Sequence, residues 1–274
     1  LARRAGAADA PHVLLYAHHD VQPPGDRANW NSEPFEATLK GERLYGRGAA
    51  DDKAGVVTHL SALRGLKSLA ETLRIGVTVF IEGEEEAGSE SFLNFLNDNK
   101  TDLKADLIVV ADSGNWSEEI PALTTSLRGV VSQTFTLRTL DHALHSGMYG
   151  GPLPDAMTAM IRLLASLHDE AGNVAVSGLK SDPTSGPEVS FENLVKESGL
   201  LPGVERIGTK PITQQIWGEP ALTVIGIDFP SVAVSSNTAQ PQVTARVSLR
   251  LAPSEDPAKG LELLRQHLEK FAPF

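Results

Sequence analysis

The first half of the chain alternates apolar runs typical of β-strands with a helical pattern. The apolar runs lie at residues 12–17, 73–81 and 107–111, and between the first two Val57, Leu60, Leu63 and Leu66 recur at the spacing of one helix face. Strands that alternate with helices predict a largely parallel sheet. We therefore expect an α/β domain over residues 1–127.

The pattern changes near Arg128. From there apolar and polar side chains alternate along one predicted strand, which is typical of a sheet with one exposed face. A helix at 154–168, a stretch at 177–219 that includes a long loop or an irregular arm, strands at 221–227 and 242–251, and a helix at 256–271 are predicted to follow. The order β-α-β-β-α predicts an α+β domain over residues 128–274 that lacks one closing strand.

Composition and charge narrow the class of protein. The 274 residues are 41% hydrophobic and 22% charged, which is typical of a folded soluble chain. The net charge of −11 repels phosphate backbones and anionic lipid, and the apolar runs are far shorter than the roughly 20 residues of a membrane helix, so we expect neither nucleic acid nor membrane as a partner. The absence of cysteine fits a cytoplasmic protein and leaves histidine and carboxylates as the available metal ligands.

Polar clusters follow three of the predicted strands. They are His18-His19-Asp20, the run from Glu82 to Glu86, and Asp112. The carboxyl ends of parallel strands meet at one edge of a sheet, where ligands bind. A fourth cluster, Asp51-Asp52, ends a glycine-containing loop before the predicted helix.

Each cluster has an ordinary structural explanation. A histidine at a strand end can bond a turn aspartate, Asp51 or Asp52 can cap the helix, and an acidic run can be a solvated loop. Gathered carboxylates, however, repel one another unless a cation compensates. Nitrogen and oxygen ligands without sulfur suit zinc, manganese or cobalt, so the four clusters together favour a dinuclear hydrolase over a structural acidic edge.

Four segments, in this order and spacing, make the pattern specific. They are Ala-His-His-Asp-Val-Gln-Pro at 17–23, the loop at 46–55, the acidic run at 82–89, and Asp-His-Ala-Leu-His-Ser-Gly-Met-Tyr-Gly-Gly at 141–151. Together they resemble the aminoacylase/carnosinase family of di-zinc metallopeptidases, and most closely its dipeptidase branch. The resemblance implies a zinc-peptidase-like catalytic domain with an inserted ferredoxin-like lid and dimerisation domain, and hence a homodimer.

The same resemblance assigns roles to residues of the first domain. It implies two zinc ions, with manganese or cobalt as alternatives. It also implies that Glu85 is a general base, which deprotonates a metal-bridging water and passes the proton to the leaving amine. Asp20 would orient a histidine ligand, and Asp51 would bridge the two metals. The implied metal ligands are His18, Asp51, Glu86 and Asp112.

In the second domain the resemblance implies residues that bind substrate. His145 would stabilise the oxyanion, although a local turn bond beside Ser146 is the alternative. Arg250 would grip a terminal carboxylate, with Arg246 on the same strand face as a competitor and a solvated charge as the alternative for either. Asn237 would add polar contacts.

Three functions follow as hypotheses. The favoured one is hydrolysis of dipeptides or small peptides, the second is deacylation or desuccinylation of N-acyl amino acids, and the third is a dimeric binding or scaffold protein without activity. Members of the family continue past the position of Phe274 with a last strand and a final histidine ligand. We therefore expect this chain to be a fragment at both ends, inactive by itself because its second metal site is incomplete.

Overall fold

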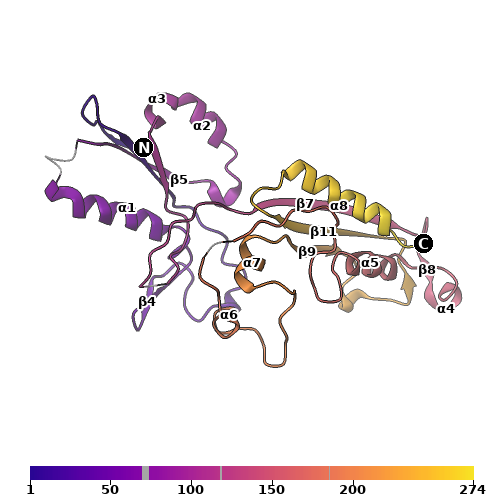
Figure 1. Ribbon diagram of the computed structural model, residues 1–274. Coiled ribbons are helices and arrows are strands. Elements are labelled where there is room, and N and C mark those ends of the chain that lie inside the picture. Colours follow the sequence, from indigo (N-terminus) through magenta and orange to yellow (C-terminus); the bar gives the residue numbers. More distant parts are fainter. Residues whose placement is uncertain (70–73, 118, 185) are drawn as a thin grey trace. The chain divides into compact units, whose positions relative to one another are not determined.

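The computed structural model describes residues 1–69, 74–117, 119–184 and 186–274. The chain divides into two compact units, Leu1–Thr124 and Thr125–Phe274. Figure 1 labels their helices and strands along the chain. Within the described ranges, every helix falls short of the length or the apolar character that crossing a membrane requires.

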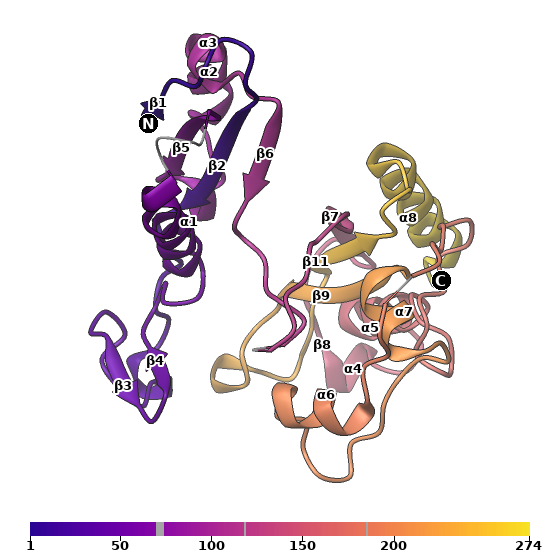
Figure 2. The same ribbon diagram turned by 60° about the vertical axis from the view of Figure 1, so that its left-hand side comes forward.

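Unit 1 is built on a four-stranded sheet with the order β1-β5-β2-β6. Strand β2 runs parallel to β5 on one side and to β6 on the other, and Figure 2 shows it between them. Strand β1 pairs with β5 in the antiparallel direction. The predicted mostly parallel sheet is confirmed, while the start of the strand predicted at 73 lies outside the described residues. The strands are β1 (Ala2–Arg4), β2 (His12–His18), β5 (Gly76–Glu82) and β6 (Leu107–Val110).

Helix α1 (Lys53–Gly65) packs against β2, as the apolar periodicity predicts for a helix at this place. Its buried positions, however, are Gly55 and His59, whereas Val57 of the predicted apolar stripe is 59% exposed. The reason is close approach: a Cβ atom at Gly55 would lie 2.0 Å from the carbonyl oxygen of Ala111. The glycine therefore turns a different face of the helix to the sheet.

Aromatic side chains join the sheet of unit 1 to helix α2 (Phe92–Asp98). The ring of Phe80 on β5 stacks on those of Phe92 and Phe95, with centroids 5.9 and 5.1 Å apart, and meets Tyr16 of β2 edge-on at 5.5 Å. These contacts hold β2 and β5 in place beneath α2. The remaining elements are η1 (Arg27–Asn29), β3 (Thr38–Lys40), β4 (Arg43–Tyr45), η2 (Leu66–Leu69), η3 (Glu85–Ala87) and α3 (Lys100–Leu103).

Unit 2 is built on an antiparallel sheet with the order β7-β11-β9. Its strands are β7 (Gly129–Arg138), β9 (Ala221–Asp228) and β11 (Gln242–Leu251). Along β11, fully buried residues alternate with more exposed ones, so the sheet has one apolar and one polar face, as predicted. The short strands β8 (Leu144–His145) and β10 (Thr238–Ala239), which pair with each other, were not predicted.

Helices α5 (Ala156–Ala165) and α8 (Pro257–Phe271) cover the apolar face of this sheet. Asp155 and Asp256 cap them by accepting the backbone N–H groups of Thr158 and Lys259. The elements β7, α5, β9, β11 and α8 thus follow in the predicted order. The core they share contains Leu163, Leu167, Val247, Leu249, Leu251, Leu264 and Leu268.

The stretch 177–219 contains two helices that were not predicted, α6 (Phe191–Ser198) and α7 (Ile212–Trp217). The predicted irregular structure remains in the described residues of 177–190 and 199–211, which form neither helix nor strand. The hydroxyl of Ser190 caps α6, and Gly199, at φ 69°, ends it in the left-handed conformation. These local signals stand among Gly, Pro and Ser residues that are also common in loops. The other short elements of unit 2 are α4 (Ser146–Tyr149) and η4 (Val232–Val234).

Candidate metal centre

The parallel strands of unit 1 deliver polar side chains to one edge of the sheet. His18 is the last residue of β2, and β5 is followed by the turn η3, which begins at Glu85. Asp112 follows two residues after the end of β6. Because these three strands are parallel neighbours, the three side chains are gathered at the same edge.

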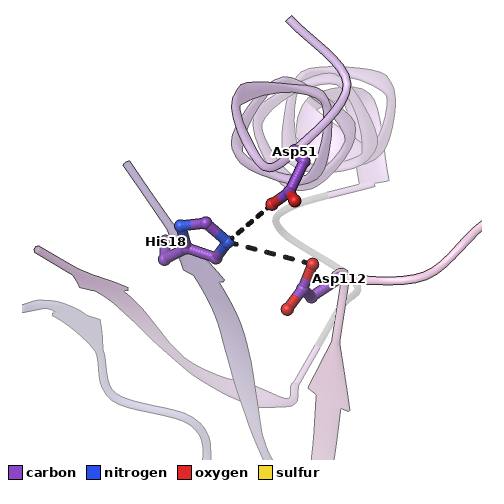
Figure 3. A group of neighbouring side chains, drawn as sticks. All are labelled: His18, Asp51 and Asp112. Atoms are coloured by element: carbon purple, nitrogen blue, oxygen red, sulfur yellow. Dashed lines mark hydrogen bonds and ion pairs between the residues drawn. The ribbon is translucent and has the colours of Figure 1, made fainter. Parts of the chain in front are cut away.

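His18, Asp51 and Asp112 form the centre of this group (Figure 3). Each offers one ligand atom, and the three atoms lie within 4.8 Å of one another. Nε2 of His18 is 3.0 Å from Oδ1 of Asp51 and 3.9 Å from Oδ1 of Asp112. Oε2 of Glu85 lies 4.0 Å from the same nitrogen. One imidazole nitrogen among carboxylate oxygens is a donor set that suits zinc, manganese or cobalt.

Asp20 connects the histidine to the turn that carries Glu85. The Nδ1 atom of His18 is 3.4 Å from Oδ1 of Asp20 and 3.2 Å from its carbonyl oxygen. The other carboxylate oxygen of Asp20 accepts the backbone N–H of Glu86 at 2.8 Å. Burial raises the pKa of Asp20, but the N–H groups of Glu86 and of Glu85 outweigh it and lower the pKa overall. The carbonyl oxygen of Asp20 is thus the hydrogen-bond partner of Nδ1, while its Oδ1 is buried without a hydrogen-bond partner among the described residues, and Nε2 is the nitrogen directed at the two aspartates.

Asp52 is a buried residue whose hydrogen bond to His18 was not predicted from the sequence. Its side chain is only 2% exposed and accepts the backbone N–H of His18 at 3.1 Å and that of Gly55 at 3.0 Å. Asp52 is therefore the cap of α1, and Asp51, joined to it by a cis peptide bond, faces His18. Two adjacent aspartates before a helix were the available signal, and cap preference alone does not say which of them is buried.

The charges of the centre oppose one another. Burial raises the pKa of Glu85, the positive charge of His18 works against that shift, and the carboxylate of Asp112 adds to it. Burial and the neighbouring Asp52 likewise raise the pKa of Asp112. Burial lowers the pKa of His18, yet Asp112 and the other carboxylates raise it overall. Crowded carboxylates of this kind repel one another unless a cation compensates their charge.

Glu86 lies outside the group of three. Its carboxylate accepts a hydrogen bond from Nε2 of Gln22 at 2.7 Å, and its carbonyl oxygen accepts from the same atom at 3.2 Å. Of the four ligands implied by the resemblance, the structure thus brings together His18, Asp51 and Asp112, with Glu86 on the neighbouring turn.

A second buried carboxylate supports the end of β5. Glu82 is 6% exposed and accepts hydrogen bonds from the hydroxyls of Tyr16, at 2.5 Å, and Ser89. Burial and the bond to Glu82 raise the pKa of Tyr16 well above its usual range, so the phenol keeps its proton. Glu84 instead accepts from Ser91 on an exposed turn. The acidic run therefore divides into buried and solvated members, a division that its one-letter sequence did not show.

The predicted residues of unit 2 lie on strands β8 and β11 and, in the case of Asn237, directly before β10. His145 ends β8, and its Nδ1 accepts the backbone N–H of Gly147 at 3.1 Å. The carbonyl of Asn237 accepts the N–H of Ser146 at 2.9 Å, so His145 and Asn237 are neighbours at the β8–β10 pair. Arg250 and Arg246 lie elsewhere, both exposed on the polar face of β11.

A mostly parallel sheet gathers one imidazole and several carboxylates at its carboxyl edge, an arrangement typical of divalent metal sites in α/β proteins. The model of the peptidase family M20/M25/M40 matches residues 14–262. The chain belongs to this family.

Two relatives cover nearly the whole chain. A cysteinylglycine-S-conjugate dipeptidase of Corynebacterium striatum is 37% identical over 271 residues, which are 97% of this chain and 59% of the relative. A beta-Ala-His dipeptidase of Mus musculus is 30% identical over 98% of this chain and 57% of its own length. The chain thus spans somewhat more than half of the length of these relatives.

Two solved structures share the fold. An M20 family metallo-carboxypeptidase of Sulfolobus solfataricus has a TM-score of 0.78 and 26% identity, and covers 98% of this chain and 63% of that one. Human carnosine dipeptidase 1 has a TM-score of 0.72 and 28% identity, with 98% and 60% covered.

Proposed function

We propose that the protein to which this chain belongs is a metal-dependent dipeptidase that hydrolyses dipeptides or small peptides with a free carboxyl terminus. The observation that carries the proposal is the approach of Asp51, Asp112 and Glu85 to a single nitrogen of His18. The named activities of the relatives, which are dipeptidases, support the same substrate class.

We assign the metal ligands from this arrangement. His18, Asp51 and Asp112 would hold one ion, and Asp51 with Glu86 would contribute to a second. Zinc is the ion we propose, with manganese and cobalt as alternatives that the donor set also suits. A divalent ion bound there polarises a carbonyl oxygen and lowers the pKa of water.

Glu85 is the proposed general base. Its carboxylate lies at the edge of the group, and burial together with Asp112 raises its pKa above the usual value of a glutamate. A carboxylate of raised pKa accepts a proton from water more readily and, once protonated, returns it to a leaving amine. Asp20 has a supporting role, because it fixes both the His18 ring and the turn of Glu85.

Unit 2 would supply substrate contacts. In this proposal Arg250 binds the terminal carboxylate, Asn237 adds a polar contact, and His145 donates a hydrogen bond to the oxyanion. The division at residues 1–127 and 128–274 then separates a catalytic domain from a ferredoxin-like lid domain. The lid would also pair two copies of the protein as a homodimer in the cytoplasm.

The test is Glu85→Gln in the full-length protein. We expect kcat to fall by a factor of about 10²–10⁴, because the proton acceptor is lost, while metal content stays the same. Glu84→Gln is the matched control, since Glu84 lies next in the chain and its carboxylate accepts hydrogen bonds from Ser91 on an exposed turn. Unchanged turnover in Glu85→Gln would contradict the mechanism.

The substrate class needs a separate measurement. We expect a panel of dipeptides to be hydrolysed faster than N-acyl amino acids by the unaltered protein. A reversed preference would favour a deacylase, and no turnover of either class by metal-loaded protein would favour the scaffold hypothesis.

A further inference from the structure

We infer that Arg128 and Arg250 act as a pair that binds one carboxylate on the polar face of the unit 2 sheet. Arg128, which has no assigned role in the proposed function, would then determine specificity for substrates with a free carboxyl terminus. This inference rests on the proposed dipeptidase function and adds a residue to its substrate site.

Strand register places the two arginines on one face. Arg250 of β11 is paired with Val130 of β7, and Leu251 with Gly129. Arg128 directly precedes β7, so alternation puts it on the side of Val130 and Arg250. The opposite side of β11 carries the buried Leu251 and belongs to the apolar core. Arg128 and Arg250 are therefore diagonal neighbours across two adjacent strands.

The positive charge of this pair is not neutralised within the described residues. Arg128 is half-buried, and its Nη1 atom is buried without a hydrogen-bond partner. Burial lowers the pKa of Arg128, and the positive charge of Arg250 lowers it further. In the described part of the chain no carboxylate forms an ion pair with either guanidinium, in contrast to Arg265, which contacts both Glu262 and Glu269.

This lack of a partner is unexpected in so acidic a chain. With 35 acidic and 24 basic residues, carboxylates are abundant. A buried guanidinium N–H without an acceptor is costly, and a second guanidinium beside it adds repulsion. An arrangement that lacks only an anion is typical of a site that receives one from a ligand.

A carboxylate fits what the pair lacks. It offers two oxygens with about four acceptor positions, and each guanidinium presents parallel donors. Bound to both arginines, it would satisfy Nη1 of Arg128 and offset the repulsion from Arg250. A carboxamide carries no charge and would leave both guanidinium charges uncompensated. The pair thus selects acids against amides.

The arrangement also distinguishes Arg250 from Arg246. Arg246 faces Gly226 of β9 at the bulge, four residues from Arg250, and Asp228 lies on the neighbouring part of that strand. Arg250 lies at the end of β11 that meets Arg128, and its charge is the one that acts on Arg128. Arg250 is therefore the member of the pair.

The experiment compares each dipeptide with its C-terminal amide in the full-length protein. For Arg128→Gln we expect kcat/KM for the free acid to fall about 10- to 100-fold, mainly through KM, because one charged hydrogen-bond donor group is lost. For the dipeptide amide, kcat/KM for cleavage of the peptide bond should change less than threefold, so that the variant loses the preference for the free acid. Arg128→Lys, which keeps the charge without the planar fork, should restore part of that preference.

Arg138→Gln is the matched control, because Arg138 lies on the same face at the far end of β7. It should keep the parent preference. A second measurement uses protein that carries Glu85→Gln, which should bind substrates without turning them over. Calorimetry on this protein, with and without Arg128→Gln, gives the ratio of the affinities for the free acid and the amide.

The outcomes separate this inference from the proposed function. An active Arg128→Gln enzyme, or an active Arg128→Lys enzyme if the first variant does not fold, that keeps the full acid preference would overturn the pairing alone. Equal losses for acid and amide would also overturn it, since they indicate a structural role. Failure of the unaltered protein to hydrolyse any dipeptide would instead overturn the proposed function.

Discussion

Unit 1 buries polar side chains beside apolar ones at its sheet, whereas the buried side chains of β11 in unit 2 are all apolar. In unit 1 the buried groups include His18, Asp52, His59, Thr78 and Glu82, and the strand β6 exposes apolar residues, with Leu107 at 57% and Ile108 at 60%. In unit 2 every second residue of β11, from Val243 to Leu251, is at most 1% exposed and apolar.

The difference separates two uses of a sheet. An antiparallel sheet with one apolar face gains its stability from area removed from water. Unit 1 instead places ionisable groups at the ends of strands, where each needs a hydrogen-bond partner or a counter-charge. Substitutions should therefore affect metal binding in unit 1 and the free energy of unfolding in unit 2.

The largest effect should come from His18→Ala. Removing the nitrogen nearest to Asp51 and Asp112 should lower the affinity for zinc by more than about 100-fold, a larger loss than supporting contacts give. Calorimetric titration of metal-free full-length protein measures it. His142→Ala is the matched control, because His142 is an exposed histidine that also contacts an aspartate, Asp141. Equal zinc affinities for the two variants would contradict the assignment of His18 as a metal ligand.

The next effect should come from Leu249→Ala in the core of unit 2. Leu249 is fully buried, and its truncation should lower the free energy of unfolding by about 2–5 kcal/mol. Urea denaturation followed by circular dichroism measures it, with Ser248→Ala on the polar face expected to stay within about 0.5 kcal/mol of the parent. Leu249→Ala should leave the zinc affinity unchanged. A loss of zinc affinity as large as that of His18→Ala would contradict the separation of metal binding in unit 1 from stability in unit 2.

The smallest effect concerns pH. Burial lowers the pKa of His267 overall, with a smaller contribution from Lys270, although the hydrogen bond with Ser166, whose hydroxyl is 3.1 Å from Nε2, works against this shift. The imidazole of His267 is therefore protonated more readily in the unfolded chain than in the folded one. Stability is complete above the unfolded value of about 6.5 and falls as pH drops through the folded value. His267→Gln should lose less stability than the parent between pH 7.5 and 5.5 in the same denaturation assay. An identical pH dependence would show that another group titrates.

Periodicity was sufficient for the main elements, since β2, β5, β6, β7, β9 and β11 all lie where apolar runs predicted strands. It was insufficient for the buried face of α1. There, the approach of Gly55 to Ala111 depends on a contact between segments 56 residues apart, and only the fold makes it.

The candidate site shows the same division. Strand ends and an acidic run located His18, Glu85 and Asp112, because side chains at the ends of parallel strands share an edge. The burial of Asp52 and the contact of Glu86 with Gln22 depend on how loops return to the sheet. Arg128 gave no signal in the sequence, since a single arginine before a strand is ordinary and its lack of a partner appears only in three dimensions.

The carboxylate of Asp52 has a consequence for the entropy of ligand binding. It accepts one N–H from β2 and one from α1, and so fixes the backbone beside Asp51 as the chain folds. Conformational freedom that is lost in folding is not lost again when a ligand binds. Asp51, which faces His18, is thus preorganised by its buried neighbour Asp52. With a shorter or uncharged residue at position 52, the entropy of ordering this backbone would be lost when the ligand binds.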